Sequence, residues 1–386
     1  MTAGPLKVGL VAGEASGDTL GAGLIEAIRR RRPDARFFGV AGPRMIAAGC
    51  DAWQPSERLA VMGLFEILGS LPALLRLRRE IRARFLAERP DVFVGIDAPE
   101  FNLGLAASLK AEGLLTVQYV SPQVWAWRQG RIARIARAVD LVLCLLPFER
   151  QFYRDHAIQA EFVGHPLADQ IPLEVDRIAA RTRLGIAAGA SLIAILPGSR
   201  RGEVERLGDD FAAAARWILE RRPATKFIAP MANAEVREIF AAALARSDAG
   251  AAVTLLEGDA QAALAAANAV LVASGTATLE ATLTGRPMVV AYRLGWLTSF
   301  VLRHLGLMKA PFFAQPNLLA GKRLVPELFG SEVTPERLGR ELLGFIDNPA
   351  QVAELEGEFT AIHRELRRGA NERAAQAVLA LVAGRS

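Results

Sequence analysis

Small and charged residues gather at two places in the second half of the chain, each directly after an apolar run. They are Gly198, Ser199 and Arg200 in LPGSRRGEVE, and Ser274, Gly275 and Thr276 in SGTATLE. A turn of this kind before a helix presents backbone N–H groups, and arginine adds a cation whose fork fits phosphate. The two turns together predict a site for a nucleoside diphosphate.

Glu280 follows the second turn by one helical turn, on the side that can face the same ligand. A carboxylate there accepts hydrogen bonds from ribose hydroxyls, as acidic residues do in dinucleotide sites. Two plainer alternatives stay open: an ordinary capped turn with a solvated arginine pair at 198–201, and a solvated Glu280. Because two anion-ready turns occur in one half of the chain, the nucleotide site is favoured.

A carboxylate suited to acid–base chemistry lies in the first half of the chain. Asp97 ends the apolar run of VGIDAPEFN, and Pro99 fixes the turn that follows. A carboxylate at the carboxyl end of a buried strand can act as a general base. The alternative is that Asp97 caps the next helix.

Two further loops carry groups that suit a sugar. Glu14 and Ser16 stand in AGEASGD, and Gln123, Trp125 and Arg128 stand in SPQVWAWRQGR. Small polar side chains offer a sugar many hydrogen-bonding groups, and loop aromatics beside arginine are typical of a ligand cleft. The tryptophans also allow a second interpretation, as part of the core.

The elements that must position these residues are short apolar runs alternating with helical patterns. Runs at 7–13 and 91–99 predict strands, and patterns at 18–31 and 101–112 predict helices. The runs do not alternate in polarity, which indicates a parallel sheet buried on both faces. A break at 161–177 predicts a linker, after which the alternation restarts.

The fold class predicted is therefore α/β, with two Rossmann-like domains facing each other across a cleft. We expect an N-terminal domain over 1–165 and a second domain over 176–348. A helical tail over 349–386 is expected to pack back on the first domain.

Composition narrows the class of protein. The 386 residues are 52% hydrophobic and carry a net charge of +5, which argues against disorder and suits an anionic partner. Cys50, in a probable loop, and Cys144, in an apolar run, form no disulfide or zinc pattern. G-x-G-x-x-G and P-loop motifs are missing, and no uncharged run reaches the roughly 18–20 residues of a membrane span. We expect a cytoplasmic protein without metal or cofactor.

The segment 59–80 is unusually apolar and ends in arginines. Ser70 and Pro72 predict a helix start, after which one stripe suits the core: Leu74, Leu77, Ile81 and Phe85. The residues before it cover almost every direction of a short helix, so an exposed patch is expected that includes Met62, Leu64, Phe65 and Leu68. This patch predicts docking on a membrane, helped by Arg76, Arg78, Arg79 and Arg82; a fully covered helix is the alternative.

Several long motifs carry a family resemblance. AGEASGD, GIDAPEFN, YVSPQVWAWRQGR, VGHPLAD, LPGSRRGEVE, SGTATLEATL and QPNLLAG stand in the order found in the lipid-A-disaccharide synthase family. The resemblance covers about residues 6–380. One departure is Glu100, where the family pattern has Asp.

The resemblance implies an inverting GT-B glycosyltransferase that works without metal. The reaction it implies transfers 2,3-diacylglucosamine from UDP-2,3-diacylglucosamine to 2,3-diacylglucosamine 1-phosphate (lipid X), giving a β-1,6-linked disaccharide and UDP. The enzyme would sit peripherally on the cytoplasmic face of the inner membrane, touching anionic lipid, in a Gram-negative bacterium. The roles implied are Asp97 as general base, Glu14 and Ser16 as sugar contacts, Arg200 at the UDP phosphates, Glu280 at the ribose and Asn317 as a further cleft residue.

Three rival functions stay open. They are another UDP-sugar transferase with a lipid acceptor, a UDP-sugar epimerase, and a non-catalytic nucleotide-binding protein at a membrane. The acyl-sized apolar stretch and the carboxylates argue against the last two. Nucleic acid is not an expected partner, and a homodimer stays an open alternative.

Overall fold

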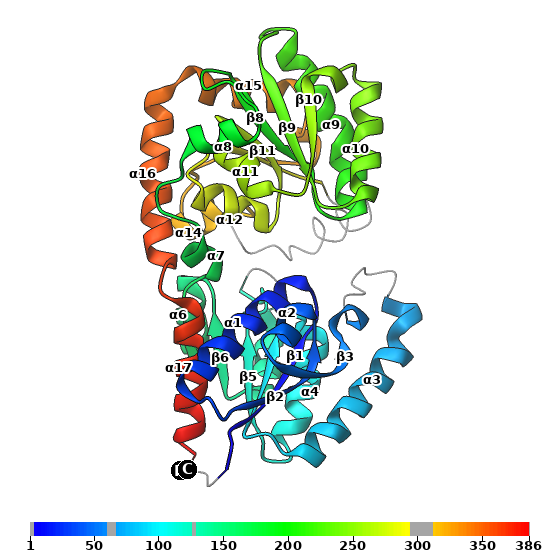
Figure 1. Cartoon of the computed structure of the whole chain (residues 1–386), viewed down its shortest axis with the longest axis vertical. Coiled ribbons are helices and arrows are strands. Elements are labelled where there is room, and N and C mark those ends of the chain that lie inside the picture. The colour runs from blue at the N-terminus through cyan, green and yellow to red at the C-terminus, as the bar shows by residue number, and fades with distance from the viewer. Residues whose placement is uncertain (1–3, 60–66, 126–128, 294–311, 386) are drawn as a thin grey trace. The chain divides into compact units, whose positions relative to one another are not determined.

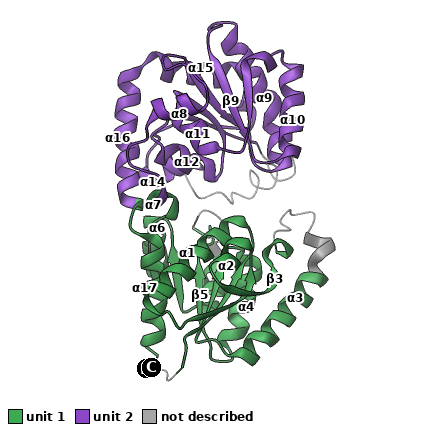
Figure 2. Ribbon diagram, viewed as in Figure 1, with its two compact units in different colours: residues 1–169, 366–386 green, residues 170–365 purple. Residues whose placement is uncertain are grey.

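The computed structural model describes residues 4–59, 67–125, 129–293 and 312–385, without the side chains of 67–71 and 129 (Figure 1). The chain forms two compact units (Figure 2). Unit 1 comprises Met1–Asp169 and Leu366–Ser386, and unit 2 comprises Gln170–Glu365. Each unit is built on a parallel sheet with helices, which confirms the predicted α/β class with two Rossmann-like domains.

Unit 1 has a sheet in the order β3-β2-β1-β4-β5-β6-β7. Its strands are β1 (Lys7–Ala12), β2 (Arg36–Ala41), β3 (Cys50–Pro55), β4 (Val92–Ile96), β5 (Leu115–Tyr119), β6 (Leu141–Cys144) and β7 (Ala160–Phe162). Its helices are α1 (Ala15–Arg31), α2 (Pro43–Ala47), α3 (Ile67–Glu88), α4 (Pro99–Lys110), α5 (Ile132–Ala138), α6 (Pro147–Arg154), α7 (Pro166–Gln170), whose last residue begins unit 2, and α17 (Ala370–Ala383). The strand order reverses between β1 and β4, and open parallel sheets bind ligands at such a switch point.

Unit 2 repeats the plan with the sheet order β10-β9-β8-β11-β12-β13. Its strands are β8 (Leu192–Leu196), β9 (Lys226–Met231), β10 (Val253–Glu257), β11 (Ala269–Ala273), β12 (Met288–Tyr292) and β13 (Glu327–Phe329). Its helices are α8 (Arg177–Arg183), α9 (Arg201–Leu219), α10 (Ala234–Arg246), α11 (Ala260–Ala266), α12 (Thr276–Leu283), α14 (Gln315–Ala320), α15 (Pro335–Asp347) and α16 (Pro349–Leu366), which ends one residue into unit 1. Here the switch point lies between β8 and β11.

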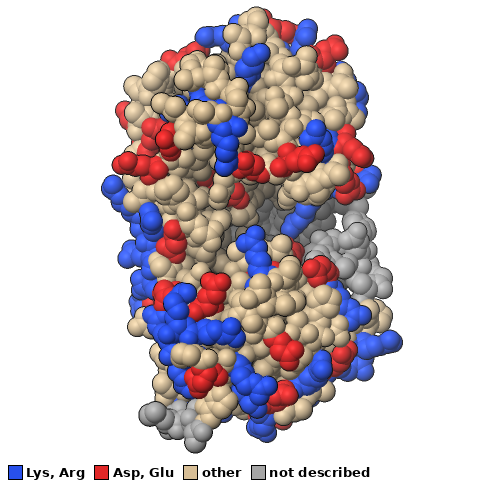
Figure 3. Space-filling view, in the orientation of Figure 1, with Lys and Arg blue, Asp and Glu red and all other residues tan. Residues whose placement is uncertain are grey.

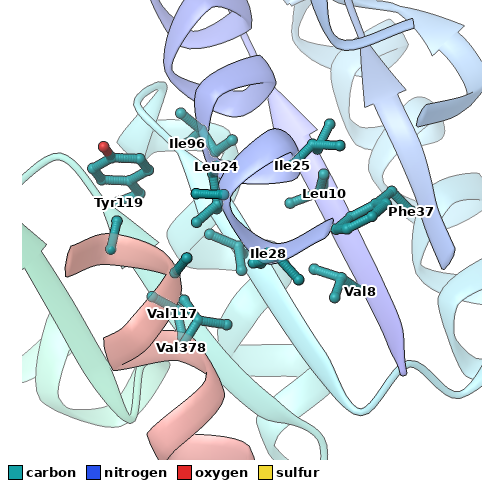
Figure 4. Packing of buried hydrophobic residues seen from close by; sticks show 14 of the residues in the cluster. Val8, Leu10, Leu24, Ile25, Ile28, Phe37, Ile96, Val117, Tyr119 and Val378 are labelled. Atoms are coloured by element: carbon teal, nitrogen blue, oxygen red, sulfur yellow. The ribbon is translucent and has the colours of Figure 1, made fainter. Parts of the chain in front are cut away.

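The core of unit 1 lies on both faces of its sheet, as the unbroken apolar runs predict. Leu10 of β1 packs into the cluster beneath α1 and α17, whereas its neighbour Val11 packs into the cluster beneath α3, α4 and α5. Figure 4 shows the first cluster, with Val378 of α17 beside Val117 of β5. Burial of this apolar surface stabilises unit 1 and holds its switch point in place.

The C-terminal tail divides differently from the prediction of one segment over 349–386. Helix α16 remains with unit 2, where Leu355 and Phe359 are buried. Only the segment from Leu366 joins unit 1, because α17 presents Ala374 and Val378 to α1. The predicted linker over 161–177 also contains regular structure, namely the end of β7 and all of α7.

The apolar stripe predicted on α3 is buried, with Leu77 8% exposed and Ile81 and Phe85 fully buried. The helix begins at Ile67 and contains Pro72, so the predicted start at Ser70 is wrong. The predicted lipid patch cannot be placed in the same way. Met62, Leu64 and Phe65 lie outside the described residues, as does the side chain of Leu68.

On the face shown in Figure 3, basic and acidic side chains are interspersed over each unit. Among the residues that the structure describes, no helix is long and apolar enough to cross a membrane. The same residues contain no group of three or more His, Cys, Asp or Glu side chains placed to hold a metal ion. Cys50, predicted in a loop, is buried in β3, and Cys144 is buried in β6.

Candidate active site

The switch point of unit 1 brings two of the predicted motifs to one edge of the sheet. Ala12 of β1 pairs with Ile96 of β4, so Gly13 and Asp97, which follow these strands, leave the sheet side by side, and Glu14 comes next along the chain. The approach is close: a Cβ built on Gly13 would lie 2.5 Å from the Cβ of Ala98. The AGEASGD and GIDAPEFN loops therefore lie next to each other, as a shared site requires.

Asp97 is half-buried, and it is not the N-cap residue of the helix that follows it. The N-cap residue of α4 is Ala98, so Asp97 stands one position before the cap. Asp97 and Ala98 both adopt left-handed backbone conformations, with φ of 53° and 39°. Such a conformation costs roughly 1–2 kcal/mol per residue. The structure thus places Asp97 outside the N-cap position and shows a strained turn at the predicted base.

The acidic residues of AGEASGD have different surroundings. Asp18 is 3% exposed, and its carboxylate accepts hydrogen bonds from the backbone N–H groups of Arg44 and Met45, both at 2.9 Å. Asp18 therefore caps α2 and has a structural role. Glu14 is the N-cap residue of α1 and half-buried, and Ser16 is exposed. These two remain the candidates for sugar contacts.

The loop after β5 is anchored by a buried carboxylate that the sequence does not reveal. Glu149 of α6 is 3% exposed; it accepts a hydrogen bond from Nε1 of Trp125 at 3.1 Å and another from the N–H of Leu146 at 3.1 Å. Burial raises the pKa of Glu149 to about 7. Trp125 also packs edge-on against Phe148, with ring centroids 4.8 Å apart.

The predicted sugar contacts of this loop therefore divide. Trp125 is half-buried and contacts Glu149 and Phe148 of α6, which favours its interpretation as part of the core. Gln123 is exposed. Arg128 lies outside the described residues.

Unit 2 contains a cavity of about 300 Å³ at its switch point. The turns after β8 and β11 line it together. Seven of the residues predicted to bind the nucleotide are in its wall: Gly198, Ser199, Arg200, Ser274, Gly275, Thr276 and Glu280. Strand register brings the two turns together, because β8 and β11 are neighbours in the sheet.

The turn after β8 does not present its backbone N–H groups as predicted. The N–H groups of Ser199 and Arg200 donate to Oε2 of Glu203, at 3.0 Å and 3.3 Å. Gly198 has φ of 130°, and a Cβ on it would lie 2.5 Å from the Cβ of Glu203, so the turn needs glycine here. The N-terminus of α9 is thus capped within the chain, and the exposed Arg200 side chain is what this turn offers a phosphate.

The turn after β11 differs, because the N-cap position of α12 holds a glycine, which has no side chain to cap the helix. Gly275 is the N-cap residue of this helix. The partial positive charge of a helix N-terminus attracts anions, and this one lines the cavity. Glu280 stands in the same wall, half-buried, and burial raises the pKa of its carboxyl group. An anion contact and a hydroxyl acceptor therefore share one cavity.

Asn317 does not line this cavity. Its side chain is fully buried, and Nδ2 donates to the carbonyl of Val325 at 3.0 Å and to Glu327 at 2.8 Å. Its Oδ1 accepts from the N–H groups of Leu324 and Val325. Because these contacts use its hydrogen-bonding groups, the prediction that Asn317 contacts the nucleotide is corrected: it fixes the strand entry to β13.

Other wall residues were not predicted, among them three at the ends of neighbouring strands. Met231, Ala232 and Gly258 also line the cavity, at the ends of β9 and β10. A signal was present, since ligands bind at the carboxyl ends of parallel strands and these residues directly end two of them.

Solved structures with this architecture define the class. The glycosyltransferase of kitacinnamycin matches with a TM-score of 0.64 at 16% identity, covering 98% of this chain and 99% of that one. The UDP-GlcNAc 2-epimerase of Neisseria meningitidis, solved with UDP-GlcNAc, matches with a TM-score of 0.63 at 13% identity, covering 98% and 100%. At these identities the likeness shows the fold alone, which is of the GT-B type.

The sequence is more specific than the fold. A family model described as lipid-A-disaccharide synthetase matches residues 8–381. The lipid-A-disaccharide synthase of Pseudomonas paraeruginosa (strain DSM 24068 / PA7) is 51% identical over 380 residues, which cover 98% of this chain and 99% of that protein. The one of Azotobacter vinelandii (strain DJ / ATCC BAA-1303) is 53% identical with the same shares. The chain belongs to the lipid-A-disaccharide synthase family, as the resemblance implied.

Proposed function

We propose that this chain transfers 2,3-diacylglucosamine from UDP-2,3-diacylglucosamine to the 6-hydroxyl of 2,3-diacylglucosamine 1-phosphate. The products are the β-1,6-linked disaccharide 1-phosphate and UDP. The observation that carries the proposal is the unit 2 cavity, where an uncapped helix N-terminus, Arg200 and Glu280 meet in a chain of this family.

Each group has a role in the displacement. Asp97 takes the proton of the acceptor hydroxyl, whose oxygen attacks the anomeric carbon from the face opposite the leaving group. The bond from that carbon to the UDP oxygen breaks, and negative charge grows on the diphosphate. The N-terminus of α12 and Arg200 stabilise this charge, and Glu280 accepts hydrogen bonds from the ribose. We expect these groups to suffice without a metal ion.

The test is to incubate the purified protein with the two acylated glucosamines, with and without EDTA. Release of UDP together with an acylated disaccharide supports the proposal, and equal rates in EDTA support the metal-free mechanism. UDP-GlcNAc is tested in parallel. Epimerised sugar with no disaccharide would instead assign the chain to epimerase chemistry.

We further propose peripheral contact with anionic lipid on the cytoplasmic face of the inner membrane. The support is the apolar segment that includes Met62, Leu64, Phe65 and Leu68, together with helix α3, where Arg76 and Arg79 are exposed. Arg82 contributes less, since it pairs with Glu112 at 2.6 Å. Both substrates carry acyl chains, so contact with a membrane brings the enzyme to them.

A further inference from the structure

Two buried amide side chains converge on the backbone carbonyl of Asp97. Nδ2 of Asn102 lies 2.8 Å from this oxygen, and Nε2 of Gln118 lies 3.1 Å from it. Asn102 comes from α4 and Gln118 from β5, and both are at most 1% exposed. Neither residue reaches the cavity of unit 2, and neither is explained by the roles assigned above.

The surrounding carbonyls fix the orientation of each amide. Besides Asp97, the nitrogen of Asn102 faces the carbonyls of Val11 and Ile96, and that of Gln118 faces those of Tyr119 and Val120. A reversed amide would turn its oxygen toward these acceptors. In both residues the shortest of the contacts is the one to Asp97, and among the described residues neither amide oxygen has a hydrogen-bond partner. Both side chains therefore act as donors here.

The carbonyl they hold belongs to strained backbone. Asp97 and Ala98 have positive φ, and so does Val120, the residue after Tyr119 at the end of the neighbouring strand, with φ of 76°. A β-branched residue rarely adopts this conformation. Such strain persists only where surrounding contacts over-determine it, and it clusters at functional sites.

Neighbouring glycines leave room for this arrangement. Gly95 pairs with Gln118 across β4 and β5, and a Cβ on it would lie 2.8 Å from the Cβ of Asn102. A Cβ on Gly13 of the AGEASGD motif would lie 2.5 Å from the Cβ of Ala98. Three strands thus contribute to one rigid turn below the Asp97 carboxylate.

We propose that Asn102 and Gln118 are positioning residues that hold the strained turn and so aim the Asp97 carboxylate at the acceptor hydroxyl. This inference rests on the proposed function of Asp97. A base displaced by about 1 Å loses rate steeply, whereas substrate binding elsewhere is unaffected. The amides therefore act on kcat and leave KM and UDP affinity nearly unchanged.

The experiment compares Asn102→Leu and Gln118→Met with Thr116→Val. Thr116 is a matched control, because it is also buried in β5 and loses a buried hydrogen bond, from Oγ1 to the carbonyl of Ala138 at 2.9 Å, at the other end of the strand. We expect kcat per folded protein to fall by about 10²-fold in the two amide variants. Thr116→Val should melt earlier and keep its kcat.

Two outcomes would overturn the proposal. One is a kcat at the wild-type level in folded Gln118→Met. This measurement alone tests the proposal if Asn102→Leu does not fold. The other is a loss in the amide variants that only follows the folded fraction, as in Thr116→Val. Asp97→Asn is measured alongside. If this variant keeps full activity, the proposed role of Asp97 as the base is wrong. If it is inactive while the two amide variants stay active, only the positioning role of Asn102 and Gln118 is rejected.

Discussion

Two carboxylates three positions apart, Asp97 and Glu100, differ in burial, in backbone conformation and in ion pairing. Asp97 is half-buried on a strained turn, whereas the Glu100 side chain is 49% exposed and pairs with Arg131. An exposed ion pair contributes little. The departure from the family pattern at Glu100 therefore falls on a surface residue, and the base assignment does not depend on it.

We expect Asp97→Asn to lower kcat by about 10²–10⁴-fold, the usual loss when a general base is removed. Asparagine tolerates the left-handed conformation as well as aspartate does, so the melting temperature should stay near that of the wild type. Steady-state kinetics and thermal melts check this. Glu100→Gln is the control and should keep nearly full turnover; equal losses in both variants would contradict the assignment.

The pH dependence of UDP binding belongs to Glu280. Burial raises the pKa of its carboxyl group, so on acidification it takes up a proton earlier than an ordinary glutamate would. The charged form accepts the ribose hydroxyls; affinity is therefore present above the raised pKa and falls by about tenfold as pH drops through it. Calorimetric titration with UDP between pH 8 and 5 measures this.

The diphosphate of UDP also titrates in this pH range. The Glu280→Gln variant therefore serves as the reference that separates the titration of the ligand from that of the Glu280 carboxyl group. The variant should bind UDP more weakly at neutral pH and lose the part of the pH dependence that belongs to the carboxyl group. Identical wild-type and variant profiles would remove Glu280 from the ribose site.

At the scale of residues, the sequence predicts which groups line the unit 2 cavity better than what each group does there. Motif and strand order place seven of the predicted residues in its wall. The contacts of Asn317 and Glu149 are not visible in the same way. Asn317 bonds to the segment that enters β13, 7 to 10 positions further along the chain, and Glu149 bonds to Trp125, 24 positions before it. A polar residue in a motif looks alike whether it faces a ligand or the backbone.

Helix α9 depends on the Glu203 cap to shape the turn after β8. Glu203→Ala removes the acceptor of the Ser199 and Arg200 N–H groups, and we expect it to cost about 1 kcal/mol of unfolding free energy. UDP affinity should fall as well, because this turn lines the cavity. Denaturant unfolding and UDP titration check both effects.

Two variants sharpen this test. Glu203→Gln keeps an acceptor oxygen and should retain most of the stability. Glu205→Ala lies on the same helix, where its exposed side chain pairs with Arg201, and should change UDP affinity little. Unaltered UDP binding in Glu203→Ala would show that the capped turn does not shape the donor site.

At the scale of elements, the strands inside each sheet follow from apolar runs, whereas of the four edge strands only β10 does. β3, β7 and β13 were not predicted, and all three lie at a sheet edge. Their sequences CDAWQP, AEF and ELF carry charged residues or proline. Edge strands pair on one side and remain partly solvated, so they need no continuous apolar run and give no such signal.

At the scale of the whole chain, the return of the C-terminus to unit 1 depends on contacts that no local pattern records. Ala374, Ala375 and Val378 complete a core whose other members lie before residue 164. The sequence predicts a helical tail that packs back on the first domain, but not that α16 stays with unit 2. That partition depends on which apolar surface each helix meets, a property of the folded units.

The proposed membrane contact also belongs to the whole molecule. Both signs of charge are interspersed on the face shown in Figure 3, so attraction of this face to anionic lipid has to come from a local cluster. Exposed Arg76 and Arg79 of α3 are such a cluster next to the apolar segment. We expect Arg76→Gln with Arg79→Gln to weaken binding to anionic vesicles by about 2 kcal/mol, roughly thirtyfold, and the loss to shrink at high salt.

Leu64, Phe65 and Leu68 test the apolar part of the same contact. Their joint replacement by Ser should weaken vesicle co-sedimentation at any salt concentration and lower turnover with diacylated acceptor in vesicles, since burial of apolar surface is insensitive to screening. UDP affinity and melting temperature should change little. Ile178→Ser is the control, because Ile178 is an isolated apolar residue of unit 2, 67% exposed. A large drop in melting temperature with vesicle binding intact would make the segment core and reject the membrane contact.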